Sequence, residues 1–219
     1  MQQEKVIENA IKFVKKTLKN AEGGHDWFHI DRVFKNAILI SKEEKADPFI
    51  VSLGALFHDI ADPKFHDGDE TIGPRLAKAF LKQQKVDEIV INHVIKIIKH
   101  ISFKNSLENE KKKFNSIELQ VIQDADRLDA IGAIGIARCF NYGGFKNRTL
   151  YDPEILPNLN MNKEAYKNSK GPTINHFYEK LLLLKDTMNT ESAKKIALNR
   201  HTFMEKYLNQ FYNEWNGIK

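Results

Sequence analysis

Apolar residues recur at helical spacing along almost the whole chain, and this pattern constrains the fold more than any other feature. The first such group near the N-terminus is Val6, Ile7, Ile11, Phe13 and Val14, and the next is Val33, Ala37, Ile38 and Ile40. Residues spaced in this way form one face of an α-helix. No segment alternates convincingly between apolar and polar residues, as a half-buried strand would. We therefore predict an all-α fold, a compact helical bundle.

Local signals place further helices along the chain. Asp47 followed by Pro48 is typical of an N-cap and a first helical position, and these residues precede the apolar run "FIVSLGALFHDI". The same reasoning predicts helices within residues 68–84, 87–101, 116–138, 173–188 and 191–215. The predicted bundle is therefore built from helices joined mostly by short connections.

One segment departs from the helical pattern. Residues 139–172 are rich in Gly, Asn, Lys, Tyr and Pro and too long for an ordinary connection in a compact domain. We predict a long loop near the pocket, which is a candidate cover. The chain of 219 residues with 42% hydrophobic residues shows no repeat or boundary. We predict a single domain, 1–219, with its core motifs in 25–132 and C-terminal helices in 173–217.

Composition limits the location and the partners of the protein. The single cysteine, Cys139, cannot form an internal disulfide, and the N-terminus is charged and lacks the apolar core of a signal peptide. No apolar run approaches the roughly 18 residues that cross a membrane. We expect a cytoplasmic protein without a membrane span. The "KKK" at 111–113 has no interleaved aromatic residues, so no stable nucleic-acid partner is expected, while a homodimer stays open.

Histidines and aspartates cluster in the stretches "GGHDWFHIDRV" and "LGALFHDIADPKFHDGDE". His58 ends a strongly apolar run, where the charge of Asp59 would be costly to bury without a cation. A divalent metal ion would satisfy both residues, provided that other elements complete its coordination. We select His29 and Asp126 for that role.

These residues resemble the HD-domain family of metal-dependent phosphohydrolases. The family's pattern of a lone His, a His-Asp pair and a distant Asp is matched in order by "HIDRV" (His29), by His58-Asp59 and by "DADRLDAIG". The resemblance implies a bundle of the HD-domain type. Residues 176–201 also look like a bacterial branch that resembles nucleotide pyrophosphohydrolases.

Two positions in the motif have competitors. The family's H-x-x-R-V pattern selects His29 over His25, which leaves His25-Asp26 as loop or supporting groups. Its A-D-x-L pattern selects Asp126 over Asp124, and Asp126 also shares a helical face with Ile122 and Asp129. Asp124 is then a supporting group, or a solvated or capping carboxylate.

The resemblance implies hydrolysis at a metal centre. Two imidazoles and two carboxylates suit one divalent ion, with Mn²⁺ as the first choice and Mg²⁺, Fe²⁺, Co²⁺, Ni²⁺ and Zn²⁺ as alternatives. Such an ion lowers the pKa of bound water and polarises a P–O bond, so that hydroxide attacks phosphorus. We expect hydrolysis of (d)NTPs to (d)NMPs and pyrophosphate. The alternatives are a 5′-nucleotidase, a cyclic-nucleotide phosphodiesterase or a non-catalytic nucleotide or metal sensor.

Further side chains are candidates for proton transfer and phosphate binding. The carboxylates that could manage the proton are Asp62, Asp67 and Glu70. The candidate phosphate-binding groups are Lys64, His66, Lys104, Arg127, His176 and Lys180, with Arg138 and Arg200 as further cations. His176 and Lys180 would share one face of a helix at i, i+4.

Some residues keep two interpretations. Tyr142, Phe145 and Tyr151 could stack on a base or simply pack their loop. His93 and His100 lie seven residues apart on one predicted helix. They could bind a second metal, or His100 could contact substrate, but packing is the favoured interpretation for His93.

Overall fold

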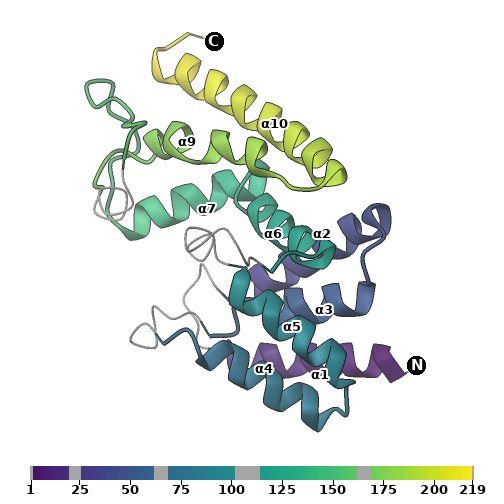
Figure 1. Cartoon of the computed structure of the whole chain (residues 1–219). Coiled ribbons are helices and arrows are strands. Elements are labelled where there is room, and N and C mark those ends of the chain that lie inside the picture. The colour runs from purple at the N-terminus through teal and green to yellow at the C-terminus, as the bar shows by residue number, and fades with distance from the viewer. Residues whose placement is uncertain (1, 20–25, 62–68, 102–113, 162–168, 219) are drawn as a thin grey trace. The chain divides into compact units, whose positions relative to one another are not determined.

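The structure of the protein, a computed structural model, describes residues 2–19, 26–61, 69–101, 114–161 and 169–218. These residues form helices and turns, and no strand occurs within them (Figure 1). The all-α prediction is therefore confirmed. The chain divides into two compact units, residues 1–126 and 127–219, which are described separately below.

The first unit is organised around one short, apolar helix. Its helices are α1 (Gln2–Thr17), α2 (Trp27–Glu44), α3 (Pro48–Phe57), α4 (Ile72–Gln83), α5 (Glu88–His100) and most of α6 (Ile117–Asp129), whose last residues belong to the second unit. Helix α3 packs against α1, α2 and α5. Every residue from Phe49 to Phe57 is buried, because Ser52 is the one polar side chain in this run and α3 has no polar face to turn to water.

The start of α3 matches the prediction. The Oδ1 atom of Asp47 accepts hydrogen bonds from the backbone amides of Phe49 and Ile50, at 2.8 and 3.2 Å, and Pro48 occupies the first turn. Glu118 of α6 also accepts a hydrogen bond from the Asp47 amide, at 3.3 Å. The N-terminus of α3 is therefore tied to the first turn of α6.

Helices α3 and α6 approach each other closely at Gly54. A Cβ atom at this position would lie 2.5 Å from Cδ1 of Ile122, a distance that real Cβ atoms essentially never show. Only glycine lets the two helices come this close without a shift of Ile122. This contact brings together the two helices whose C-terminal ends carry His58 and Asp126.

The prediction of one helix over 116–138 is wrong. Helix α6 ends at Asp129 and α7 (Gly132–Phe145) begins two residues after Ala130. Gly132 has φ +74°, a left-handed conformation that glycine adopts without steric cost. The chain therefore turns between two helices whose apolar periodicity reads as continuous.

The irregular segment also begins later than expected. Helix α7 continues past Cys139 to Phe145, so that irregular backbone starts at Lys146. Gly143 is buried in this helix, where a Cβ atom would collide with the side chain of Thr173. Gly143 therefore marks close packing within a helix, whereas the composition of this segment had suggested a loop.

In the second unit, a long C-terminal helix packs against the elements before it. Besides α7 the unit contains α9 (Asn175–Glu179), the 3₁₀-helix η4 (Leu181–Thr187) and α10 (Glu191–Trp215), and α10 packs against α7 and η4. One helix was expected over 173–188, but Lys180 has φ −148° and separates α9 from η4. The four consecutive leucines at 181–184 are apolar on every side, so their spacing carries no periodicity. The sequence therefore could not show that an α-helix ends here and a 3₁₀-helix begins.

Tyr151 follows the packing interpretation. Its ring contacts the rings of Phe211, Tyr212 and Trp215 on α10, at centroid distances of 5.9, 5.3 and 5.0 Å. Tyr142 and Phe145 are largely exposed, and the ammonium of Lys146 lies over both rings. In the described part of the chain, no helix combines the length and apolar character that a membrane span requires.

Candidate metal centre

His29 enters the site from the first turn of α2. Asp26 is the N-cap of this helix, and its Oδ1 atom accepts a hydrogen bond from the His29 amide at 2.9 Å. The imidazole is almost completely buried, with 3% of the side chain exposed. The cap therefore fixes the backbone from which a buried ring projects.

His58 enters at the C-terminal end of α3. Its Nδ1 atom lies 2.8 Å from the carbonyl oxygen of Ala55. Because a carbonyl can only accept, Nδ1 carries the proton in the neutral ring and Nε2 keeps its lone pair. Nε2 is buried and receives no hydrogen bond from the described residues. This is the tautomer and orientation that a metal-binding histidine adopts.

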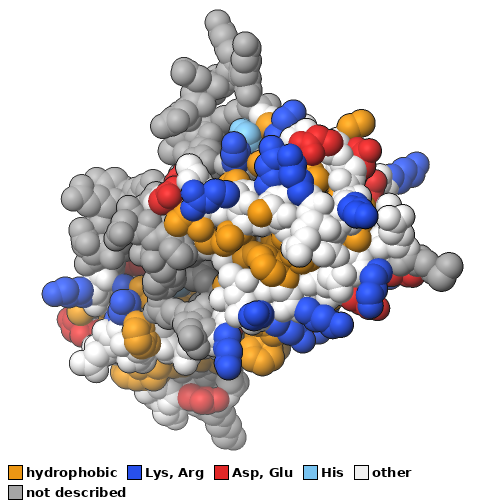
Figure 2. All heavy atoms as spheres, turned by 90° about the horizontal axis from the view of Figure 1, so that it is seen from below, with side chains coloured by type: hydrophobic (Ala, Val, Ile, Leu, Met, Phe, Trp, Pro, Cys, Tyr) orange, Lys and Arg blue, Asp and Glu red, His pale blue; other side chains and the backbone are white. Residues whose placement is uncertain are grey.

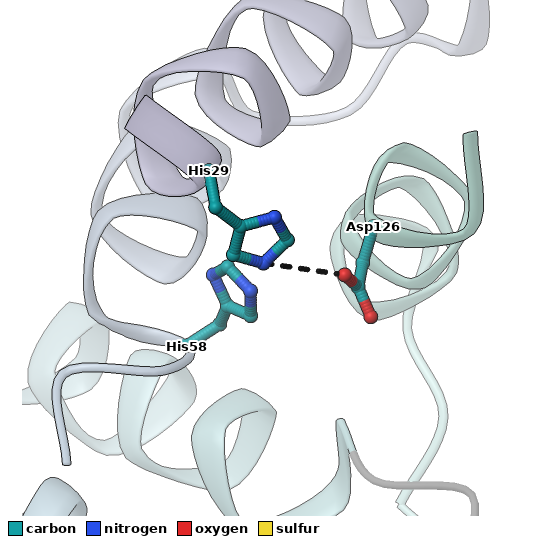
Figure 3. A group of neighbouring side chains, drawn as sticks. All are labelled: His29, His58 and Asp126. Carbon is teal, nitrogen blue, oxygen red and sulfur yellow. Dashed lines mark ion pairs between the residues drawn. The ribbon is translucent and has the colours of Figure 1, made fainter. Parts of the chain in front are cut away.

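Asp126 completes a group of three potential ligands from three helices (Figure 3). Its Oδ1 atom lies 3.5 Å from Nε2 of His29, and the two imidazole centroids are 5.4 Å apart. One ligand atom from each of His29, His58 and Asp126 lies within 4.8 Å of the others. The three residues could therefore hold a metal ion.

Asp59 lies beside the same two imidazoles. Its Oδ2 atom is 3.9 Å from Nε2 of His29 and 3.7 Å from Nε2 of His58. Adjacent ligand atoms around an ion with bonds of about 2.1 Å are roughly 3.0 to 3.4 Å apart. The separations of Asp59 are somewhat longer than this spacing, and Asp59 is outside the group of three potential ligands. The chemistry of the four side chains suits a divalent cation.

Asp124 and Asp126 have different environments. Asp126 faces His29 with its side chain half exposed, whereas Asp124 has no exposed surface and is outside the three-residue group. The interpretation of Asp124 as a solvated carboxylate is therefore wrong. The periodicity of α6 distinguished the two because positions two apart point in different directions around a helix.

Most of the predicted catalytic and phosphate-binding residues next to the metal motif cannot be placed. Asp62, Lys64, His66, Asp67, Lys104 and the competing His25 lie outside the described residues. Glu70 is described and exposed, one residue before α4. Its role in proton transfer stays a prediction.

Three predicted cations of the second unit have identifiable surroundings. The guanidinium of Arg127 donates to the carbonyl of Thr187 at 2.7 Å. Lys180 lies outside α9, so it does not share a helical face with His176 as expected, although its amide donates to the His176 carbonyl at 3.1 Å. Burial first, and then the charges of Lys180 and Arg148, lower the pKa of His176 to about 4. His176 is therefore neutral at pH 7 and offers hydrogen bonds without a charge.

His93 and His100 form hydrogen bonds and ring contacts with neighbouring residues. Nε2 of His93 lies 3.0 Å from Oγ of Ser116 and 3.3 Å from Oε2 of Glu118. Nδ1 of His100 lies 2.7 Å from the carbonyl oxygen of Lys96, and both imidazoles contact the ring of Phe114. Within the described residues neither histidine joins a group that could hold a metal, which favours the packing interpretation.

A basic groove was not anticipated from the sequence. It encloses about 500 Å³ beside α4 and α5 and is lined by Thr71, Pro74, Arg75, Lys78, Ala79, Lys82, Ile95 and Lys99. Figure 2 shows the molecule from the side of α4, where blue Lys and Arg side chains flank orange apolar ones. The groove contains no metal-centre residue. The cations of the groove on α4 recur at helical spacing. In the sequence this pattern is the same as that of an ordinary solvent-exposed helix face, so it did not predict a groove.

Comparison with known proteins agrees with this site. The HD domain family matches residues 27–131, which include His29, His58, Asp59 and Asp126. The uncharacterized protein YpgQ of Bacillus subtilis is 37% identical over 100% of this chain and 98% of its own length.

Two crystal structures extend the agreement to the fold. An HD-superfamily hydrolase from Bacillus thuringiensis is 45% identical, covers 99% of both chains and has a TM-score of 0.79. Bacillus subtilis YpgQ in complex with ADP is 36% identical, covers 98% of this chain and 97% of its own, and has a TM-score of 0.76. With the ordered His and Asp residues gathered in one site and this similarity over its full length, the chain belongs to the HD-domain family and is an HD-superfamily hydrolase.

Proposed function

We propose that the protein hydrolyses nucleoside triphosphates to monophosphates and pyrophosphate at a centre formed by His29, His58, Asp59 and Asp126. The observation that carries the proposal is the convergence of three ligand atoms within 4.8 Å of one another, with Asp59 beside both imidazoles. The nucleotide assignment is supported by the relative YpgQ, whose crystal structure contains ADP. The preference for triphosphates rests on the resemblance of residues 176–201 to nucleotide pyrophosphohydrolases.

The four residues would bind the metal with complementary roles. His29 and His58 supply neutral nitrogen donors from buried positions, and the hydrogen bond from His58 to Ala55 keeps its ring in the required tautomer. Asp59 and Asp126 supply two negative charges, which balance a divalent cation. When bound, this ion would acidify a coordinated water molecule and polarise a phosphate oxygen. Mn²⁺ is the first choice because carboxylate and water oxygens suit it, and Fe²⁺, Ni²⁺ and Zn²⁺ are alternatives because imidazole suits them.

Other side chains would manage the substrate's charge and the proton. A triphosphate carries several negative charges, which Lys64 and Lys104 of the first unit would offset, while His66 would contact phosphate. Phosphate binding by Arg127, His176 and Lys180 of the second unit stays a prediction from the sequence. Asp62, Asp67 or Glu70 would accept the proton from the attacking water.

The decisive experiment is product analysis across a screen of nucleotides and divalent metals. Each reaction is resolved by ion-exchange chromatography. We expect a monophosphate and pyrophosphate in equal amounts, with Mn²⁺ among the most effective metals. A matched pair of variants, Asp59→Asn at the site and Asp31→Asn on the surface of α2, separates this activity from a contaminating enzyme.

Other outcomes correspond to the alternative functions. Orthophosphate from monophosphates would indicate a 5′-nucleotidase, and opening of a cyclic phosphate would indicate a phosphodiesterase. Nucleotide binding with no turnover under any metal would indicate a sensor. The cytoplasmic location, the single domain and the absence of a nucleic-acid partner stay predictions.

A further inference from the structure

We infer that Asp129, Arg138 and Arg200 form a positioning group, which holds the last turn of α6 and thereby the carboxylate of Asp126. The inference rests on the proposed role of Asp126 as a metal ligand. It assigns these arginines to the support of the metal centre, whereas the sequence had suggested them as candidate phosphate-binding cations.

The last turn of α6 depends on partners from outside the helix. The final carbonyl groups of an α-helix have no intrahelical donor. The carbonyl of Arg127 accepts from the amide of Ala130 at 3.1 Å. The Leu128 carbonyl accepts from the amide of Ile131 at 3.3 Å and also from the side chain of Arg200. The Asp129 carbonyl accepts from the side chain of Arg138. Two guanidinium groups thus act together as a C-cap.

The charges favour the same arrangement. The side chain of Asp129 is 1% exposed and pairs with Arg138, which also donates to the Asp129 carbonyl. A buried carboxylate needs such a partner. Burial lowers the pKa of Arg200, and the negative charge of Asp129 opposes that effect. Positive groups at this end of α6 also interact favourably with the helix dipole.

Gly132 provides the room that Arg200 occupies. Its φ of +74° turns the chain out of α6, and a Cβ atom there would lie 3.0 Å from both Cβ and Cγ of Arg200. Any side chain at this position would be strained and would press on Arg200. The glycine is therefore a second requirement of the same cap.

Asp126 lies in the turn that this cap holds. Its carboxylate is 3.5 Å from Nε2 of His29, a separation that depends on the helical position of residue 126. If the last turn frays, the carboxylate is no longer held near the imidazole. Loss of the groups that orient a metal ligand typically weakens metal binding about 10- to 100-fold.

The test is a pair of measurements on the full-length Arg138→Leu variant. Mn²⁺ affinity is measured by electron paramagnetic resonance titration, and amide hydrogen exchange is followed at residues 126–131. We expect Mn²⁺ binding to weaken about 10- to 100-fold and exchange in this segment to accelerate. Arg138→Lys keeps the charge and a donor, so it should recover most of the affinity.

Leu208→Ala is the matched control, because Leu208 is buried further along α10 and makes no polar contact with α6. If this variant, at a comparable loss of thermal stability, weakens Mn²⁺ binding as much as Arg138→Leu does, the positioning role is refuted. Faster exchange with unchanged Mn²⁺ affinity refutes it as well. Asp129→Asn preserves side-chain shape and replaces Arg138→Leu if that variant does not fold.

These results are separable from the proposed function. A wild-type protein that binds Mn²⁺ but hydrolyses no nucleotide contradicts the substrate assignment alone. A wild-type protein that binds no divalent metal contradicts both the metal centre and the positioning group.

Discussion

At the C-terminal end of α3, the Nδ1 atom of His58 lies 2.8 Å from the carbonyl oxygen of Ala55, three residues earlier. This hydrogen bond assigns the imidazole proton to Nδ1, and the buried Nε2 atom is left to face the group that contains His29 and Asp126. The orientation of a metal-binding ring is therefore set by its own helix.

Removal of the Asp59 carboxylate should separate metal binding from folding. We expect Asp59→Ala to lower metal affinity by orders of magnitude and to reduce turnover to near background, because it removes a charge that the ion needs. Helical content should persist. Calorimetric titration of metal, circular dichroism and a turnover assay provide the measurements.

Asp31→Ala is the control for this variant. Asp31 pairs with Lys35 on the surface of α2 at 2.7 Å, and an exposed pair of this kind contributes about 0.3–0.5 kcal/mol. The control should bind metal normally. Near-normal metal binding by Asp59→Ala itself would refute the assignment of His58 and Asp59 as the metal pair.

Chelation should abolish hydrolysis, and added Mn²⁺ should restore it. The folded site binds metal whereas the unfolded chain lacks the assembled site, so metal should also raise the unfolding temperature. At 100 times the dissociation constant the stabilisation amounts to about 2.7 kcal/mol. Equal activity before and after exhaustive chelation contradicts a metal-dependent mechanism.

A pair of glycine substitutions tests the contact between α3 and α6. Gly54→Ala places a Cβ atom 2.5 Å from Ile122, and overpacking of this kind typically costs about 1–3 kcal/mol. Gly144→Ala on α7 meets nothing within 4 Å and should stabilise its helix by about 0.5–1 kcal/mol. Denaturant unfolding of both variants measures the difference, and equal stabilities contradict the close approach at Gly54.

His176 should make stability depend on pH. Its pKa in the folded protein is lowered from 6.5 to about 4, so the unfolded chain binds more protons between these values. Stability is therefore complete above about pH 6.5 and is lost as the pH falls towards 4. The loss is on the order of 2 kcal/mol after allowance for partial exposure.

Urea unfolding at pH 7 and pH 4.5 measures this effect. His176→Gln cannot be protonated, so the part of the pH dependence due to this residue should disappear in the variant. If the wild type and His176→Gln lose the same stability over this interval, burial of the neutral imidazole is not the cause.

Much of the metal centre could be predicted from the sequence, because its parts have local signatures. Asp47-Pro48 predicted the start of α3, and its apolar run predicted complete burial. The family pattern, together with helical periodicity, selected His29 and Asp126, which the structure brings to 3.5 Å from each other. Spacing along a helix determines which of its side chains share a face. The sequence of a single helix is therefore enough to predict this.

The remaining features depend on residues far apart in the chain. The ends of α6, α7 and α9 and the partners of Arg127, Arg138 and Arg200 follow from packing within the second unit. Arg200, for example, caps Leu128, 72 residues away. The sequence determined the helical class, and it predicted the residues His29, His58 and Asp126 that the structure brings together as potential metal ligands. Only the tertiary structure decided which cations are committed to capping α6, because a guanidinium group pairs with whichever carbonyl or carboxylate the fold places within its reach.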